Sequence, residues 1–265
     1  MRRIKLTIAY DGTEYKGWQV QPGLPTVQGF LEAAFLDIEK APVHVAGSGR
    51  TDAGVHALAQ VAAVSIRNPI PTRNLKKALN RLLPFDIRVN AVEEAHEQFH
   101  PRFDAVSKTY EYRLHRGEVC SPFARRYLHH HPYPMDDSMF IEAASQLVGE
   151  FDFSCFSASD DRDAEKRSKV RRIFDSEAIL TGERLIYRVT GSGFLKHMVR
   201  NIVGTLLEAG KGNVDREQLR WLLTAPPNIK AGPTAPASGL FLTEVHYGSN
   251  DPATIGTRSK PTVDA

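Results

Sequence analysis

The chain is organised around residues 46–57, Ala46-Gly47-Ser48-Gly49-Arg50-Thr51-Asp52-Ala53-Gly54-Val55-His56-Ala57. This stretch follows the short apolar run Val43-His44-Val45 and precedes a second run, Gln60 to Ile66, so we expect it to connect two strands. Its glycines let the backbone turn tightly and approach a ligand closely. A generic loop of this kind has an Asp that caps backbone N–H groups and a solvated Arg, and that alternative stands beside the functional one. In the functional interpretation, the loop presents the carboxylate of Asp52, with Arg50 beside it, as a reaction centre.

The first hundred residues predict a strand, a helix, two strands, a helix and a strand. Ile4, Leu6, Ile8 and Tyr10 alternate with polar or basic residues, which is typical of a strand with one buried face. Helices are expected after Thr26, which is a suitable N-cap, and over about Arg73 to Leu83. The helical stripe after Thr26 is expected to bury these residues: Val27, Phe30, Leu31, Ala34, Phe35 and Ile38.

The second half repeats this pattern. A strand carries Tyr110, Tyr112 and Leu114 on one side, and helices, further strands and a last strand from Leu240 to Tyr247 follow. The fold class is therefore α+β, with two ferredoxin-like (RRM-like) halves over residues 1–104 and 105–248. Each half is a mostly antiparallel sheet with helices on one face, and the two sheets are expected to form a central RNA-binding cleft. The charged stretch 157–169 reads as a mobile loop and the polar tail 249–265 as disordered.

Composition excludes several classes of protein. The chain has 265 residues, of which 42% are hydrophobic, and its formal net charge is +3, which permits a polyanionic partner without requiring one. Cys120 and Cys155 cannot form a disulfide framework and suit a reducing compartment. No apolar run reaches the ~20 residues of a membrane span, so a cytoplasmic protein is expected. Motifs for nucleotide hydrolysis, dinucleotide binding and acyl transfer are missing from the sequence.

Metal binding is a weak alternative. The run His129-His130-His131 cannot direct three adjacent side chains at one ion, and a structural or RNA-facing role is favoured. His56 lies four residues after Asp52, but a metal-dependent hydrolase centred on this pair lacks further ligands. We therefore expect neither a metal nor an organic cofactor.

Gly49-Arg50-Thr51-Asp52-Ala53-Gly54-Val55-His56-Ala57 resembles the catalytic signature of the tRNA pseudouridine synthase A family. Five further blocks resemble that family in the same order: Tyr10-Asp11-Gly12-Thr13, Gly17-Trp18-Gln19-Val20-Gln21, Thr26-Val27-Gln28-Gly29, Phe194-Leu195-Lys196-His197-Met198-Val199-Arg200-Asn201 and Ala235-Pro236-Ala237-Ser238-Gly239-Leu240. The resemblance covers roughly residues 3 to 247. It departs modestly from the family pattern at Leu128-His129-His130-His131 and in the charged loop 159–169.

The resemblance implies an enzyme that converts uridine to pseudouridine at positions 38–40 in the anticodon stem-loop of tRNA. It implies that Asp52 is the catalytic nucleophile or base, that Arg200 pairs with it, and that Tyr110 packs against the target base. The family works as a homodimer, and basic residues of both chains would then contact one tRNA. Residues suited to such contacts are Arg2, Arg3, Lys5, Lys76, Lys77, Arg81, Arg125 and Arg126.

The remaining substrate-binding candidates lie around the loop. Arg50 is expected to grip a phosphate or to occupy the space that a flipped base leaves, and Thr51 adjoins it. Trp18, beside Gln19, either belongs to the core or stacks on bases, and the sequence alone favours neither. A non-catalytic RNA-binding protein on the same scaffold is the alternative function, against which the intact Gly49-Arg50-Thr51-Asp52 run argues.

Overall fold

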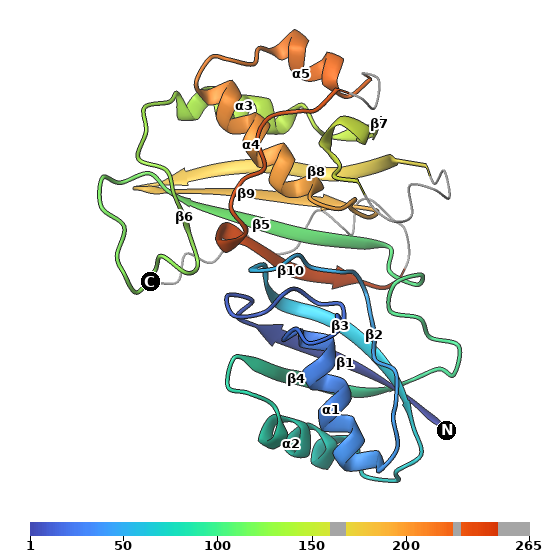
Figure 1. Cartoon of the computed structure of the whole chain (residues 1–265). Helices are drawn as coiled ribbons and strands as arrows, with labels where there is room; N and C mark the ends of the chain where they lie inside the picture. Colours follow the sequence, from blue (N-terminus) through green and yellow to red (C-terminus); the bar gives the residue numbers. More distant parts are fainter. Residues whose placement is uncertain (160–167, 225–228, 249–265) are drawn as a thin grey trace.

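The computed structural model describes residues 1–159, 168–224 and 229–248 (Figure 1). The predicted disordered tail and most of the predicted mobile loop lie outside these residues. The N-terminal half contains six elements: β1 (Arg2–Tyr10), α1 (Val27–Glu39), β2 (Ala46–Gly47), β3 (His56–Ile66), α2 (Thr72–Leu82) and β4 (Ile87–Ala95). The succession of strands and helices is the predicted one. The strand expected at residues 43–45 lies slightly later, at β2, and β3 begins inside the quoted stretch, at His56.

The C-terminal half is longer and contains two short strands, β6 and β7, that the sequence did not indicate. Its elements are β5 (Ser107–His115), β6 (His129–His130), α3 (Asp137–Ser145), β7 (Gly149–Asp152), η1 (Ser154–Phe156), β8 (Val170–Thr181), β9 (Arg184–Gly191), α4 (Met198–Gly210), α5 (Arg216–Leu222), η3 (Ala237–Gly239) and β10 (Leu240–His246). Figure 1 shows α1 and α2 beside the strands of the first half, α3 and α4 beside those of the second, and α5 beyond α3 and α4 at the top of the view.

The strands of both halves form one continuous, mostly antiparallel sheet, with the order β4-β1-β3-β10-β5-β9-β8-β7. The two halves meet where β10 pairs in parallel with the start of β3, at Phe241 with His56 and Leu242 with Ala57. On its other edge β10 pairs antiparallel with β5. The end of the 46–57 stretch therefore lies at the junction between the halves.

The local signals placed most of the core correctly. In β1 the side chains of Ile4, Leu6 and Ile8 are buried, as the alternation predicts. Thr26 caps α1, because its side chain accepts a hydrogen bond from Gly29 N. Phe30 departs from the predicted inward stripe: its side chain is 36% exposed, and its ring contacts Tyr15 edge-on at 5.6 Å between centroids.

The strand residues that alternate with the core residues point to the other face of the sheet, and this face is rich in ion pairs. Lys5 pairs with Glu93, Arg113 with Glu111, and Arg188 with Glu244. Charges neutralised in this way attract a polyanion weakly. Among the described helices, none has the length and apolarity needed to cross a lipid bilayer.

Candidate active site

A glycine brings two loops together at Asp52. Gly17 has φ +90°, a conformation that side chains disfavour, and a Cβ on it would lie 2.5 Å from Thr51 O. The next residue, Trp18, donates from its backbone N to Thr51 O at 3.0 Å. The loop between β1 and α1 thus fixes the backbone on which Asp52 stands.

Asp52 and Arg200, which are 148 positions apart in the sequence, meet in space. Arg200 Nη1 donates to Asp52 Oδ2 at 3.3 Å, and Arg200 Nε donates to Ala235 O at 2.7 Å. The second bond fixes the guanidinium while the first neutralises the carboxylate. Asp52 remains partly accessible, with its side chain 25% exposed, so a ligand can reach it.

His197 completes this group, and sequence reasoning assigned it no role. Its Nε2 lies 3.5 Å from Asp52 Oδ2, and its backbone adopts φ +61° at the N-cap of α4. A left-handed conformation at a non-glycine residue stores strain that the surrounding structure must offset. Burial, with Arg200 and Lys196 nearby, lowers the pKa of His197, although Asp52 opposes the shift. The imidazole is therefore mostly neutral at pH 7.

Tyr110 lies in β5 and is 8% exposed. Its ring meets Phe194 edge-on, with the centroids 5.0 Å apart. Burial, with Tyr10 and Asp52 adding to it, raises the pKa of Tyr110 above its usual value, so the phenol keeps its proton. These two rings offer an apolar surface beside the carboxylate.

Asp52, His197, Tyr110 and Phe194 line one cavity of about 840 Å³. Its walls come from the loops of residues 16–21 and 44–55, from β5, and from the start of α4. Because α1 and α4 both contribute to its walls, the cavity lies at the junction of the halves. A cavity of this size accommodates a nucleotide.

Two of the predicted substrate-binding residues are largely buried. Trp18 is 2% exposed, and a Cβ on Gly47 would come within 2.5 Å of its ring. Thr51 is 6% exposed, and its hydroxyl bonds to Tyr10 OH at 2.8 Å. Both packing contacts support the shape of the loop, and both residues also line the cavity.

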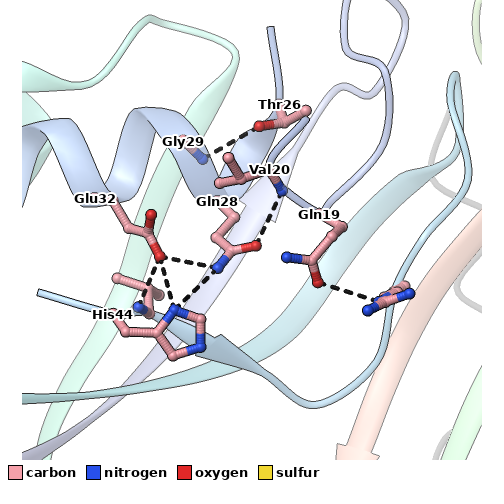
Figure 2. A network of polar contacts seen from close by, with 9 residues as sticks. Gln19, Val20, Thr26, Gln28, Gly29, Glu32 and His44 are labelled. Atoms are coloured by element: carbon pink, nitrogen blue, oxygen red, sulfur yellow. Dashed lines mark hydrogen bonds and ion pairs between the residues drawn. The ribbon is translucent and has the colours of Figure 1, made fainter. Parts of the chain in front are cut away.

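Arg50 and Gln19, two further predicted substrate-binding residues, lie at the cavity edge. Arg50 is exposed, and its Nε donates to Gln19 Oε1 at 3.1 Å, a contact that Figure 2 shows. The remaining nitrogens of this guanidinium are available to a phosphate. Gln19 therefore orients the side chain that the sequence analysis assigned to RNA.

One carboxylate and one amide tie the cavity walls to α1 (Figure 2). Glu32 Oε1 accepts hydrogen bonds from Val45 N at 3.0 Å and from Gln28 Nε2 at 2.9 Å. Gln28 Oε1 in turn accepts from Val20 N at 3.1 Å. The helix thus holds both the segment before the Asp52 loop and the loop that carries Gln19.

The histidines make structural contacts. His56 is 1% exposed, stacks on Phe241 and uses its two ring nitrogens on Gly12 N and Arg126 O, so it is not free to share a metal ion with Asp52. His129 Nδ1 lies 3.1 Å from Tyr112 OH, and His130 Nε2 3.0 Å from Gly117 O. Within the described part of the chain, no three His, Cys, Asp or Glu side chains gather as metal ligands would.

Lys108 is a second residue that sequence reasoning missed. It lies in β5, lines the cavity, and donates from Nζ to Ser48 O at 2.5 Å. Burial, with Arg102 and Arg171 nearby, lowers the pKa of Lys108 to about 8. Its position two residues before Tyr110 places both on one face of the strand, which is the signal that could have indicated it.

The chain matches known proteins over nearly all of its length. A family model described as tRNA pseudouridine synthase matches residues 6–104 and 143–248. A protein of Solibacter usitatus named tRNA pseudouridine synthase A is 60% identical over 93% of this chain and 100% of its own. Proteins of the same name from Anoxybacillus flavithermus and Geobacter sulfurreducens are 45% and 43% identical, each over 93% of this chain and 99% and 100% of their own.

A crystal structure of a Cbf5-Nop10-Gar1 complex is 11% identical, with a TM-score of 0.36, over 90% of this chain and 57% of that one. This likeness is too low to bear on the fold. The family model and the sequence relatives, in contrast, cover most of the chain, and they match it across the loop of Asp52. The chain belongs to the tRNA pseudouridine synthase family, whose members are isomerases.

Proposed function

We propose that the protein converts uridine to pseudouridine in tRNA, at positions 38–40 of the anticodon stem-loop, with Asp52 as the catalytic carboxylate. One observation carries the proposal: Asp52 Oδ2 lies 3.3 Å from Arg200 Nη1 and 3.5 Å from His197 Nε2 inside a nucleotide-sized cavity. A carboxylate beside a fixed cation and an apolar wall suits chemistry on a sugar that carries an uncharged base.

The reaction is an isomerisation. The bond from C1′ to N1 of the uracil breaks, a bond from C1′ to C5 forms, C5 loses its proton and N1 gains one. Asp52 either attacks C1′ or removes the proton from C2′, and both routes need an ionised carboxylate. Arg200 stabilises that negative charge, and its bond to Ala235 O keeps it in place. The atoms balance without an oxidant, a reductant or a nucleotide cofactor.

The target base must leave its stack to reach the cavity, which requires about a few kcal/mol. In the proposal Tyr110 and Phe194 pack against the flipped base and so offset part of this free energy. Arg50, oriented by Gln19, contacts the RNA at the cavity edge. Thr51 and Trp18 act in substrate binding by keeping the loop in shape.

The remaining RNA contacts are assigned to basic surfaces. Arg73, Lys76, Lys77 and Arg81 share one face of α2 and line a groove together with Asn80. Like charges three or four residues apart on a helix destabilise it by up to ~0.5 kcal/mol per pair. An anion that lies against them removes this repulsion. Within the described residues these four cations form no ion pair, whereas Arg2 pairs with Glu94 and Lys5 with Glu93.

The finer architecture is part of the same proposal. The strand orders β4-β1-β3-β2 and β10-β5-β9-β8 support two ferredoxin-like halves. We place the halves at 1–104 and 105–248; the family model matches residues 6–104 within the first and 143–248 within the second. We assign a homodimer that shares one tRNA in the cytoplasm, and the molar mass in solution by light scattering tests the dimer.

The test is direct. Purified protein is mixed with an unmodified tRNA transcript, and pseudouridine is then mapped by nucleotide position. Product confined to positions 38–40 supports the proposal. Pseudouridine elsewhere would overturn the site assignment. Tight tRNA binding with no pseudouridine would instead identify a non-catalytic RNA-binding protein.

A further inference from the structure

The cavity beside Asp52 has a strongly cationic lining. Of the described residues that line it, Asp52 is the only Asp or Glu, whereas seven are Lys or Arg. The described part of the lining therefore carries more positive than negative charge, which favours an anionic ligand. Arg50 and Arg200 already have assigned roles near the base. Three further cations line the cavity: Lys108 in β5, Arg171 in β8, and Arg102 in the segment before β5.

Lys108 is the most buried of these cations. Its Nζ donates to Ser48 O at 2.5 Å, and a Cβ on Gly49 would lie 3.3 Å from it. A lysine ammonium has three donors, and this contact uses one. No described carboxylate forms an ion pair with Lys108. A buried ammonium that has spare donors and no acidic partner among the described residues is a binding group for an anion.

Two arginines line the same cavity as Lys108. Arg102, in the segment before β5, and Arg171, in β8, both line the cavity, and both lie close enough to Lys108 to act on its charge. Burial also lowers the pKa of Arg171. Like charges held together at a cavity wall repel one another, and a phosphodiester between them reverses that repulsion.

We propose that Lys108, with Arg102 and Arg171, forms a subsite for one phosphodiester group of the bound RNA. The subsite deepens the proposed function, because it fixes the backbone of the RNA against the loop of Asp52. Through its bond to Ser48 O, Lys108 links that phosphate to the catalytic loop. The other acidic and histidine side chains of the described lining are Asp52, on this loop, His44, just before it, and His197, at the start of α4. The remaining titratable groups of this lining are Lys16, Arg50, Tyr110, Lys169 and Lys196.

The subsite has a measurable proton linkage. In the free protein Lys108 has a pKa of about 8, so at about pH 8.5 it is mostly neutral. An anion raises that pKa, so binding takes up a proton there and the affinity falls as the pH rises through 8. His197 titrates below its usual range near 6.5 and does not contribute in this window.

The first experiment measures the heat of RNA binding at about pH 8.5 in two buffers of different ionisation enthalpy, and the difference gives the number of protons taken up. The second measures the affinity for RNA as a function of salt concentration at pH 7. All proteins carry Asp52→Asn, so that no RNA is converted. Lys108→Gln keeps a donor for Ser48 O but removes the charge, Lys108→Met removes both, and Lys108→Arg keeps a charge that does not titrate. Lys211→Gln is the matched control. It removes one lysine that pairs with Glu208, at the far end of α4, about 20 Å from the cavity.

We expect the parent protein, which carries only Asp52→Asn, to take up a fraction of one proton when it binds RNA. The Lys211→Gln control should take up the same fraction. Lys108→Gln and Lys108→Met should take up none, bind about tenfold more weakly at pH 7, and reduce the salt slope by roughly 0.7–0.9. Lys108→Arg should keep the slope and lose the proton uptake. A salt slope and a proton uptake in Lys108→Gln equal to those of the parent would overturn the subsite. Loss of affinity in Lys108→Met but not in Lys108→Gln would also overturn it, because that result would give Lys108 a purely structural role.

Failure of this subsite is distinguishable from failure of the proposed function. Conversion of tRNA is measured separately, with Asp52 intact. A protein that makes pseudouridine without any proton uptake on binding lacks the subsite but keeps the function. Proton uptake on RNA binding without any product leaves the subsite in place and removes the function.

Discussion

Arg200 and Asp52 form an ion pair across the two halves of the chain: Nη1 of the arginine lies 3.3 Å from Oδ2 of the aspartate, and its Nε bonds to Ala235 O at 2.7 Å. The arginine is therefore fixed by the segment before β10 while it neutralises the loop carboxylate. The two halves of the chain meet in this contact.

Asp52 and Arg200 should behave as one unit. Asp52→Asn keeps the shape of the loop, so tRNA binding should persist while turnover falls on the order of 10⁴-fold. Arg200→Met should lower turnover on the order of 10²-fold, because the carboxylate loses its fixed cation. Single-turnover rates of both single variants and of the double variant test this. A double variant whose defect equals the product of the two single effects would show that the residues act independently.

His197 should contribute to turnover and not only to the fold. Asparagine tolerates its left-handed conformation, but its shorter side chain does not reach Asp52. We expect His197→Asn to keep the melting temperature and to reduce turnover about tenfold. Unchanged turnover in a stable His197→Asn protein would limit His197 to capping α4.

The basic face of α2 should bind phosphates. Replacing Lys76 and Lys77 by Ala should flatten the plot of log affinity against log salt by about 0.9 for each phosphate that is no longer neutralised. The control replaces Lys5 and Lys211, which already pair with Glu93 and Glu208. Equal slopes for the two double variants would place α2 away from the RNA.

His129 should make the protein acid-sensitive. Burial, with His131 and His130 adding to it, lowers the pKa of His129 to about 4, whereas the unfolded chain has a value near 6.5. The unfolded state therefore binds more protons between about pH 6.5 and 4, and stability falls as the pH drops through this window. His129→Gln should reduce that fall in urea unfolding. An exposed-site control, His96→Gln, should retain it.

Much of this structure was predictable because the responsible interactions are local. The cap at Thr26 depends on a neighbour three residues away, and it is confirmed. The capping box that Asp215 and Gln218 form is equally local. The parallel pairing of β10 with β3 joins Phe241 to His56 across most of the chain. No local pattern encodes that contact, so the single sheet was not foreseen.

The candidate site divides in the same way. Asp52, Arg50, Tyr110 and Arg200 stand in stretches that resemble the family, and the resemblance indicated them. His197 and Lys108 acquire their roles only through tertiary contacts, with Asp52 Oδ2 and with Ser48 O. The burial of Trp18 against Gly47 likewise required the folded loop, because aromatic residues next to Lys and Gln suit both a core and an RNA surface.

The release of tritium from C5-labelled uridine in tRNA tests the central claim, because any bond formed at C5 must expel that hydrogen. The assay compares the wild-type protein, the same protein after dialysis against a chelator, and Asp52→Asn. The account predicts equal release before and after chelation and no release from Asp52→Asn. Release from Asp52→Asn at a rate near that of the wild type would contradict the assignment of this loop as the reaction centre.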